Sequence, residues 1–226
     1  MCIEKPPMSD VIIFGVKDFA ELAHFYLETD SPYEVVAFTV SEEFMPEETT
    51  YLGLPVVRFE DIENQFSAEE YRFFAPMSAK NMNRDRQEIF GEIKRKGYRC
   101  ISYVSSRATL FNNEIGENCF ILEDNTVQPF TRIGDNVVLW SGNHIGHHGA
   151  IGDHVTFTSQ VVMSGHCSIG SNSFFGVNAT LRDGLNIAEG TFVAMASAVT
   201  TDTDAWSVYK GNPAEKLAMP STKVRL

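Results

Sequence analysis

Apolar residues recur at every sixth position through the C-terminal half of the chain. With 43% apolar residues overall, one preselected frame would be apolar throughout by chance on the order of a few times in a million. A short strand and a tight corner every six residues predict a parallel β-helix with this column facing inward. The column comprises Ile115, Ile121, Val127, Ile133, Leu139, Ile145, Ile151, Phe157, Met163, Ile169, Phe175, Leu181, Ile187, Val193 and Val199.

A second column, four positions after each apolar residue, consists mostly of small side chains, and Leu185 is its large exception. Glycine follows the apolar residue directly at Gly116, Gly134, Gly146, Gly152, Gly170 and Gly176. These glycines predict corners that require a positive φ. The second column comprises Cys119, Asn125, Thr131, Val137, Asn143, Gly149, Val155, Val161, Cys167, Ser173, Ala179, Thr191 and Ser197.

The N-terminal part, from Asp10 to about Ser105, alternates short apolar runs with amphipathic stretches. This alternation is typical of an α/β unit with a parallel sheet. We expect strands at residues 11–14, 34–38, 54–57 and 72–74, helices at 19–27 and 83–95, and a further extended segment at 98–103.

The repeats resemble the hexapeptide-repeat superfamily, in which three repeats make one coil of a left-handed β-helix and the chains form trimers. The resemblance implies coils of 18 residues and a homotrimer. The expected fold is an α/β, Rossmann-like domain over residues 1–105 followed by a left-handed parallel β-helix with a C-terminal cap over 106–226.

The charge balance narrows the range of partners. Lys and Arg number 18 against 30 Asp and Glu, and a net charge of -12 disfavours nucleic acid. No apolar run is long enough to span a bilayer, and residues 1–10 lack the apolar segment of a signal peptide. We expect a cytoplasmic protein in which Cys2, Cys100, Cys119 and Cys167 are free thiols.

Five of the six histidines lie in the repeats, at His144, His147, His148, His154 and His166. His147 and His148 follow an inward position by two and three residues, so they are expected outside, near a corner. One coil later, roughly 4.8 Å away as between neighbouring strands, come Gly165 and His166. An imidazole beside an unobstructed backbone N–H suits acyl transfer from a thioester, because the first can take a proton and the second can hold an oxyanion. The alternative is a metal site, since imidazole is a good zinc ligand.

Taken together, the two halves resemble the nucleotide-sugar acyltransferases grouped with sialic acid O-acetyltransferases and the bacillosamine-pathway N-acetyltransferase. The resemblance implies that His147 is the general base and that the N–H of Gly165 faces the thioester carbonyl. His148 stands where the family usually has an acidic partner of the base. We expect His148 to take over that role or a carboxylate to come from another subunit.

The same resemblance assigns the ligand contacts. A family histidine that contacts coenzyme A corresponds to Thr156, and a glycine-rich nucleotide loop is reduced to Gly15, Val16 and Lys17. Asn143, beside the base, is taken as a further substrate contact. The coenzyme track comprises Thr156, Gly165, Gly176, Val177, Ala194, Met195, Gly211, Pro213 and Lys216.

The leading hypothesis is transfer of an acyl group, acetyl in the simplest case, from acyl-CoA to an amino group on a nucleotide-linked sugar, with no metal required. Relatives of this kind commonly serve the synthesis of surface polysaccharides or glycans. One alternative is O-acylation of a sugar hydroxyl, as in the sialic acid branch. Another is a metal-dependent hydratase or hydrolase that uses His144, His147, His148 or His166. A third is a nucleotide-sugar binding protein without catalysis.

Overall fold

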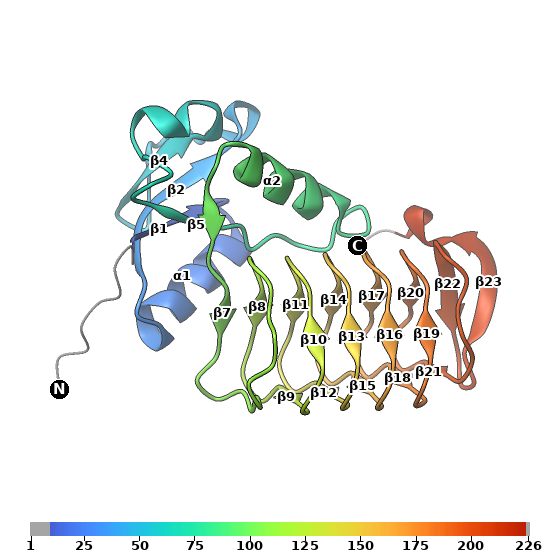
Figure 1. Ribbon diagram of the computed structural model, residues 1–226. Helices are drawn as coiled ribbons and strands as arrows, with labels where there is room; N and C mark the ends of the chain where they lie inside the picture. The colour runs from blue at the N-terminus through green and yellow to red at the C-terminus, as the bar shows by residue number, and fades with distance from the viewer. Residues whose placement is uncertain (1–9, 225–226) are drawn as a thin grey trace.

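The computed structural model describes residues 10–224 and shows an α/β domain on a left-handed parallel β-helix (Figure 1). The expected fold class is therefore confirmed. Cys2 and nearly all of the stretch considered for a signal peptide lie outside the described residues. No helix among residues 10–224 is long and apolar enough to cross a membrane.

The N-terminal sheet has the strand order β3-β4-β2-β1-β5-β6, in which every pairing except β3 with β4 is parallel. Each expected strand and helix is present, and the two-residue strand β3 was not expected. The elements are β1 (Asp10–Phe14), α1 (Asp18–Asp30), β2 (Glu34–Val40), η1 (Glu42–Phe44), β3 (Thr50–Tyr51), β4 (Leu54–Arg58), η2 (Phe59–Asn64), β5 (Arg72–Phe74), α2 (Arg84–Arg95) and β6 (Arg99–Cys100).

The chain leaves this sheet after β6, and its next strand, β7 (Tyr103–Val104), already pairs with the first coil strand β8. The segment expected at 98–103 thus contributes to two different sheets. α1 packs on the outside of the first coils, where Tyr26 contacts Phe120 and donates a hydrogen bond to Glu123. The two parts therefore share one apolar cluster.

The β-helix consists of two-residue strands separated by four-residue corners. Its three faces carry the strand sets β8-β11-β14-β17-β20, β9-β12-β15-β18-β21 and β10-β13-β16-β19, called here faces C, D and E. The strands are β8 (Phe120–Ile121), β9 (Thr126–Val127), β10 (Arg132–Ile133), β11 (Val138–Leu139), β12 (His144–Ile145), β13 (Ala150–Ile151), β14 (Thr156–Phe157), β15 (Val162–Met163), β16 (Ser168–Ile169), β17 (Phe174–Phe175), β18 (Thr180–Leu181), β19 (Asn186–Ile187), β20 (Phe192–Val193) and β21 (Ala198–Val199). A hairpin of β22 (Ser207–Lys210) and β23 (Glu215–Pro220), followed by η3 (Ser221–Lys223), extends face C.

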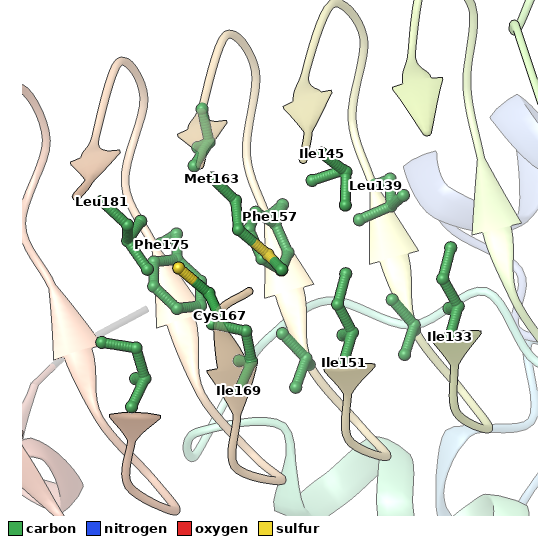
Figure 2. Packing of buried hydrophobic residues seen from close by; sticks show 14 of the residues in the cluster. Ile133, Leu139, Ile145, Ile151, Phe157, Met163, Cys167, Ile169, Phe175 and Leu181 are labelled. Atoms are coloured by element: carbon green, nitrogen blue, oxygen red, sulfur yellow. The ribbon is translucent and has the colours of Figure 1, made fainter. Parts of the chain in front are cut away.

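Neighbouring strands pair with an offset of 18 residues, as in Ile145 with Met163. This register confirms the coil length that the repeats implied. Both predicted columns point inward, and their apolar members form one core, with Ile115 partly buried at its end (Figure 2). The three described cysteines are free and buried, and burial raises the pKa of each thiol, which keeps it protonated.

The prediction that a positive φ is required at the six glycines following the inward apolar residues is wrong. None of them has a positive φ; instead, a Cβ on any of them would lie less than 3.0 Å from the next coil, as Gly146 would from Gly165 N at 2.5 Å. These positions are glycine because the coils approach closely there. The positive φ falls two residues later, mostly on Asn and His, whose αL cost is lower than for other side chains. The non-glycine residues of that column are Asn118, Asp124, Phe130, Asn136, His148, His154, Gln160, His166, Asn172, Asn178 and Ala196.

The corner between faces E and C carries the N-terminal domain, because α2 and the residues before it lie along it (Figure 1). Arg86 is 1% exposed and donates to the carbonyls of Met77 and Asn136 at 3.1 Å each. Its Nε has no partner among the described residues, and burial lowers the pKa of Arg86 to about 10. A buried cation held by carbonyls and by the Thr156 hydroxyl fixes the docking geometry, since its removal would leave those acceptors unpaired.

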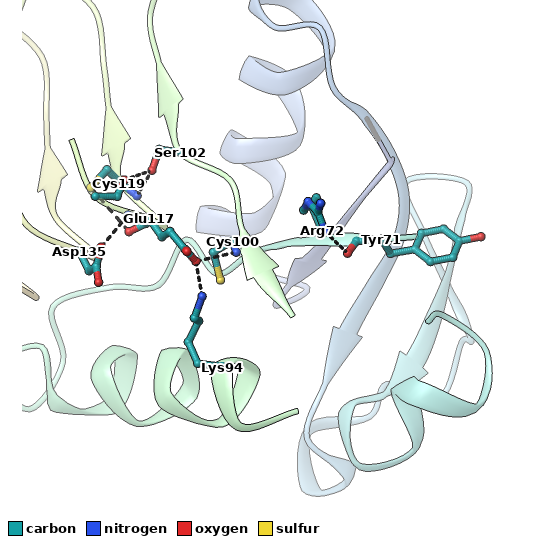
Figure 3. Close-up of polar contacts among 9 residues, drawn as sticks. Tyr71, Arg72, Lys94, Cys100, Ser102, Glu117, Cys119 and Asp135 are labelled. Carbon is teal, nitrogen blue, oxygen red and sulfur yellow. Dashed lines mark hydrogen bonds and ion pairs between the residues drawn. The ribbon is translucent and has the colours of Figure 1, made fainter. Parts of the chain in front are cut away.

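The far end of α2 is tied to the first coil by an ion pair. Lys94 Nζ lies 2.6 Å from Glu117 Oε2, and the same carboxylate accepts the Cys100 N–H at 3.0 Å (Figure 3). The Glu117 N–H in turn donates to Asp135 on the next coil at 2.7 Å. Contacts at both ends of α2 therefore hold the two parts in one orientation.

His154 makes this docked corner sensitive to pH. Its Nδ1 lies 2.9 Å from Asn136 Nδ2, and burial lowers the pKa of His154 below its ordinary 6.5. Arg86 lowers it further, whereas Asp153 and Asp135 oppose the shift. The stabilisation from neutral His154 is therefore complete above about pH 6.5 and is lost as the pH falls through the lowered pKa.

We expect His154→Asn to reduce this acid sensitivity, because Asn118, Asn136 and Asn172 already occupy the equivalent positions of neighbouring coils. At pH 7.5 the change in unfolding free energy should be about 1 kcal/mol or less. Urea unfolding at pH 7.5 and 5.5 measures the loss on acidification for both proteins. An equal loss in the two would contradict the assignment to His154.

Candidate functional site

Three histidines meet at the corner between faces D and E. His147 and His148 lie between β12 and β13, and His166 lies one coil below, between β15 and β16. His148 and His166 hold αL backbones with φ of 55° and 59°, so their rings stack at 5.2 Å and 18°. The His147 ring stands at 89° to both, 5.1 Å from His148 and 5.0 Å from His166. The structure thus confirms the predicted stacking of His148 on His166.

Phe130, one coil above, covers the other side of His148. Its ring lies 4.6 Å from the His148 ring although its side chain is 73% exposed. Phe130 was not among the residues predicted for this site. The sequence feature that could have identified Phe130 is its position eighteen residues before His148, which places it at the same corner one coil earlier.

His147 and His148 share a hydrogen bond between their Nδ1 atoms, which lie 3.0 Å apart. One nitrogen must donate and the other accept. When His147 Nδ1 carries the hydrogen, its Nε2 keeps a lone pair for a reacting group. His148 can thus orient the ring of His147, as an acidic partner would.

The imidazole of His147 lies directly over Gly165. A methyl group on Gly165 would be 2.9 Å from Cε1, 3.0 Å from Nε2 and 3.2 Å from Nδ1 of that ring. The Gly165 carbonyl accepts the Gly184 N–H at 2.9 Å, whereas the Gly165 N–H has no acceptor among residues 10–224. The site therefore combines a proton acceptor with an unoccupied backbone donor.

The backbone of His147 is fixed on both sides. Its N–H donates to Gln128 Oε1 at 3.1 Å, and its carbonyl accepts the His166 N–H at 2.9 Å. A reacting group at this corner would meet a preorganised base, since ring placement depends on coil register and not on a loop.

Of the histidines considered as metal ligands, His144 lies outside this cluster. His147, His148 and His166 are exposed, and each offers one ring nitrogen such that all three lie within 4.8 Å of one another. His144 is in β12, and His154 is at the E/C corner, beneath α2. The corner has the donor set for one imidazole-bound ion.

Two predicted ligand contacts are wrong. Asn143 is 1% exposed; it donates to Asn125 Oδ1 at 2.9 Å and to the Trp140 carbonyl, and it accepts the Val161 N–H at 2.8 Å. It belongs to the inward column of small residues, so its side chain cannot reach a substrate.

Thr156 is also unavailable, because the N-terminal domain covers it. It is 3% exposed, donates to Asn83 Oδ1 at 2.7 Å and accepts from Arg86 Nη2 at 3.2 Å. A position that the family resemblance assigned to coenzyme binding here joins the two domains.

Most other residues of the predicted coenzyme track lie at a different corner, between faces C and D. Gly176 and Val177 follow β17, and Ala194 and Met195 follow β20, with Met195 69% exposed. The Gly211 carbonyl accepts the Ala198 N–H at 2.9 Å, which places the loop containing Pro213 beside the last coil. Lys216 is on β23, paired with Asp204 at 2.7 Å.

The predicted nucleotide loop faces the same C/D corner. Gly15 has φ of +119° and donates to the Thr39 carbonyl at 2.8 Å, which forms the turn between β1 and α1. Phe19, in the first turn of α1, contacts the Trp140 ring at 5.7 Å. Val16 is half-buried and Lys17 is exposed, beside Asp18. Within one chain, Gly165 is the member of the coenzyme track that lies at the corner of His147, whereas this loop and the track residues from Gly176 onward do not lie there.

Comparisons with known proteins agree with this architecture. The family model described as bacterial transferase hexapeptide (six repeats) matches residues 114–147. A search of curated proteins found no significant match.

Several solved structures share the fold over nearly the whole chain. One is the acetyltransferase domain of PglB from Neisseria gonorrhoeae in complex with acetyl coenzyme A, with TM-score 0.81, 19% identity and coverage of 93% of this chain and 100% of that one. PerB from Caulobacter crescentus, in complex with CoA and GDP-perosamine, has TM-score 0.81, 21% identity and coverage of 92% and 97%. WeeI from Acinetobacter baumannii has TM-score 0.77, 21% identity and coverage of 92% and 99%.

The reassignment of Asn143 can be tested by comparison with Asn125, its partner in the coil above. We expect Asn143→Ala and Asn125→Ala each to lower the free energy of unfolding by about 1–3 kcal/mol, because each leaves buried polar groups unpaired. Urea denaturation measures both. Wild-type stability in Asn143→Ala, with a clear loss in Asn125→Ala, would contradict a structural role for Asn143.

Proposed function

We propose that this protein transfers an acyl group, acetyl in the simplest case, from acyl-CoA to an amino group on a nucleotide-linked sugar. The observation that carries the proposal is the His147 ring lying over Gly165, whose N–H has no acceptor among the described residues. A base and an oxyanion donor on adjacent coils are what aminolysis of a thioester requires. The structures that share the fold include proteins crystallised with acetyl coenzyme A or with CoA and GDP-perosamine, which supports this substrate pair.

In the proposed step, the amine nitrogen attacks the thioester carbonyl carbon while His147 Nε2 takes the proton of the amine. The Gly165 N–H holds the oxyanion of the tetrahedral intermediate. Collapse of the intermediate forms the amide, breaks the carbon–sulfur bond and releases CoA as its thiolate, which takes the proton from His147. As His147 becomes positive, its Nδ1–H bond to His148, 3.0 Å long, becomes charge-assisted and stronger.

The site we propose needs two subunits. His147 is at the D/E corner, whereas the proposed coenzyme residues, Val177 and Met195 among them, and the loop at Gly15 are at the C/D corner. The two corners of one chain are separated by face D, so one subunit's D/E corner has to meet its neighbour's C/D corner. A cyclic homotrimer supplies this contact three times. Residues 1–105 would bind the nucleotide and 106–226 the coenzyme, in the cytoplasm where acyl-CoA is available.

A second candidate function differs from this proposal only in the sugar atom that accepts the acyl group. His147 could equally deprotonate a sugar hydroxyl, which would make the protein an O-acyltransferase of a sialic-acid-like sugar. A panel of acceptors that includes both UDP-, dTDP- and GDP-linked amino sugars and sialic acids separates the two reactions.

We expect acetyl-CoA to release free thiol in the presence of one nucleotide-linked amino sugar, and His147→Ala to slow that release by roughly 10²–10⁴-fold. His144→Ala is the matched control, because it removes an exposed histidine outside the cluster. Thiol release measures both. Release that survives in His147→Ala would overturn the assignment of the base, and release only with hydroxyl acceptors would favour O-acylation.

The shared site predicts complementation between two inactive variants. His147→Ala disables the D/E corner, and Met195→Arg obstructs the C/D corner at an exposed position. Mixed trimers, made by coexpression or by refolding an equal mixture, should regain roughly a quarter of wild-type activity. Each site takes a D/E corner from one subunit and a C/D corner from its neighbour, and in random assembly each of these is intact about half of the time. No recovery in mixed trimers would show that the two corners do not form one site.

A further inference from the structure

The histidine corner has a property that acyl transfer does not require. Three imidazoles, and no carboxylate from residues 10–224, converge on one exposed point with their ligand nitrogens within 4.8 Å of one another. Imidazole is preferred by zinc, copper and nickel, whereas magnesium and calcium prefer oxygen. The donor set therefore selects a transition ion of the zinc class.

The separations are close to those a single ion needs. Nitrogen ligands about 2.0–2.1 Å from tetrahedral zinc are about 3.3–3.4 Å from one another. The Nδ1 atoms of His147 and His148 are already 3.0 Å apart. The ring of His166 lies 5.0 Å from the ring of His147 and 5.2 Å from that of His148. Small side-chain rotations would therefore bring a His166 nitrogen to the same ion as the third ligand.

The backbone beneath these rings is preorganised. His148 and His166 are fixed in the αL conformation at the same corner of successive coils, and the His166 N–H is bonded to the His147 carbonyl at 2.9 Å. Binding would cost little backbone entropy, and the open fourth position would take water or an anion. The net charge of -12 also favours the approach of a cation.

We propose that His147, His148 and His166 bind one divalent ion of the zinc class and that this ion inhibits the enzyme. Inhibition, which rests on the proposed function, follows because an ion on Nδ1 of His147 replaces the hydrogen bond to His148 and leaves the ring hydrogen on Nε2, which then cannot take a proton. The binding itself does not depend on that function. Because all three ligands are exposed, the ion should be removable by a chelator.

Binding is tested with the metal alone, on the full chain without a histidine tag. We expect wild type to bind one equivalent of Zn²⁺ by calorimetry and to show tetrahedral absorption with Co²⁺, and Mg²⁺ to give no signal. His166→Asn should weaken Zn²⁺ binding by at least about tenfold, because loss of outer-shell support alone costs that much. Asn suits the αL backbone there, as at Asn172 and Asn178, and His144→Asn is the matched control. Equal binding by wild type and His166→Asn would overturn the site.

Inhibition is tested by thiol release with and without Zn²⁺, followed by addition of EDTA. We expect Zn²⁺ to abolish release in wild type and His144→Asn, EDTA to restore it, and His166→Asn to need at least about tenfold more Zn²⁺, in line with its weaker binding. Binding without inhibition would overturn the inhibitory role, and activation by Zn²⁺ would favour the metal-dependent alternative. Wild type that binds Zn²⁺ but releases no thiol under any condition would contradict the proposed function while supporting the metal site.

Discussion

The stacking of each coil on the next, eighteen residues along the chain, is the constraint on which the rest of the structure depends. Pairs such as Ile145 with Met163 repeat along all three faces, so each corner residue lies over the residue of the same repeat position one coil on. Side chains far apart in sequence are thereby brought together without a flexible loop. The same spacing that buries the core also places His147 over Gly165.

This close stacking also decides which residue types can occupy the corners. Gly146 and Gly165 lack side chains because a Cβ would meet the next coil or the His147 ring. Two residues after Gly146, at His148, the backbone must enter the αL region, which Asn and His tolerate better than most side chains. Histidine at these positions therefore suits the backbone that the fold requires. His154 does so beneath α2, whereas His148 and His166 remain exposed.

The N-terminal domain docks along the E/C corner and also contacts the first coils at the C/D corner, through Tyr26 and Phe19. Arg86 and Asn83 form hydrogen bonds with backbone groups and with Thr156 along the E/C corner. A buried guanidinium without a carboxylate partner is costly unless every available carbonyl is well placed, so it favours one docked arrangement. The D/E corner keeps its histidines, and the C/D corner keeps its exposed Val177 and Met195.

The sequence alone determined the coil, its two inward columns and the pairing of His147 with Gly165, because a strict six-residue period converts directly into a position in space. It also predicted the α/β elements of the N-terminal half, since their apolar runs follow strand and helix periods. The roles of Asn143 and Thr156 were decided only by the tertiary structure. Burial depends on what packs against a residue, and Thr156 is covered by a segment seventy residues earlier in the chain. Which corner holds the histidine cluster and which holds the predicted coenzyme residues likewise emerged only when the three faces were assembled, because the repeat is the same on all of them.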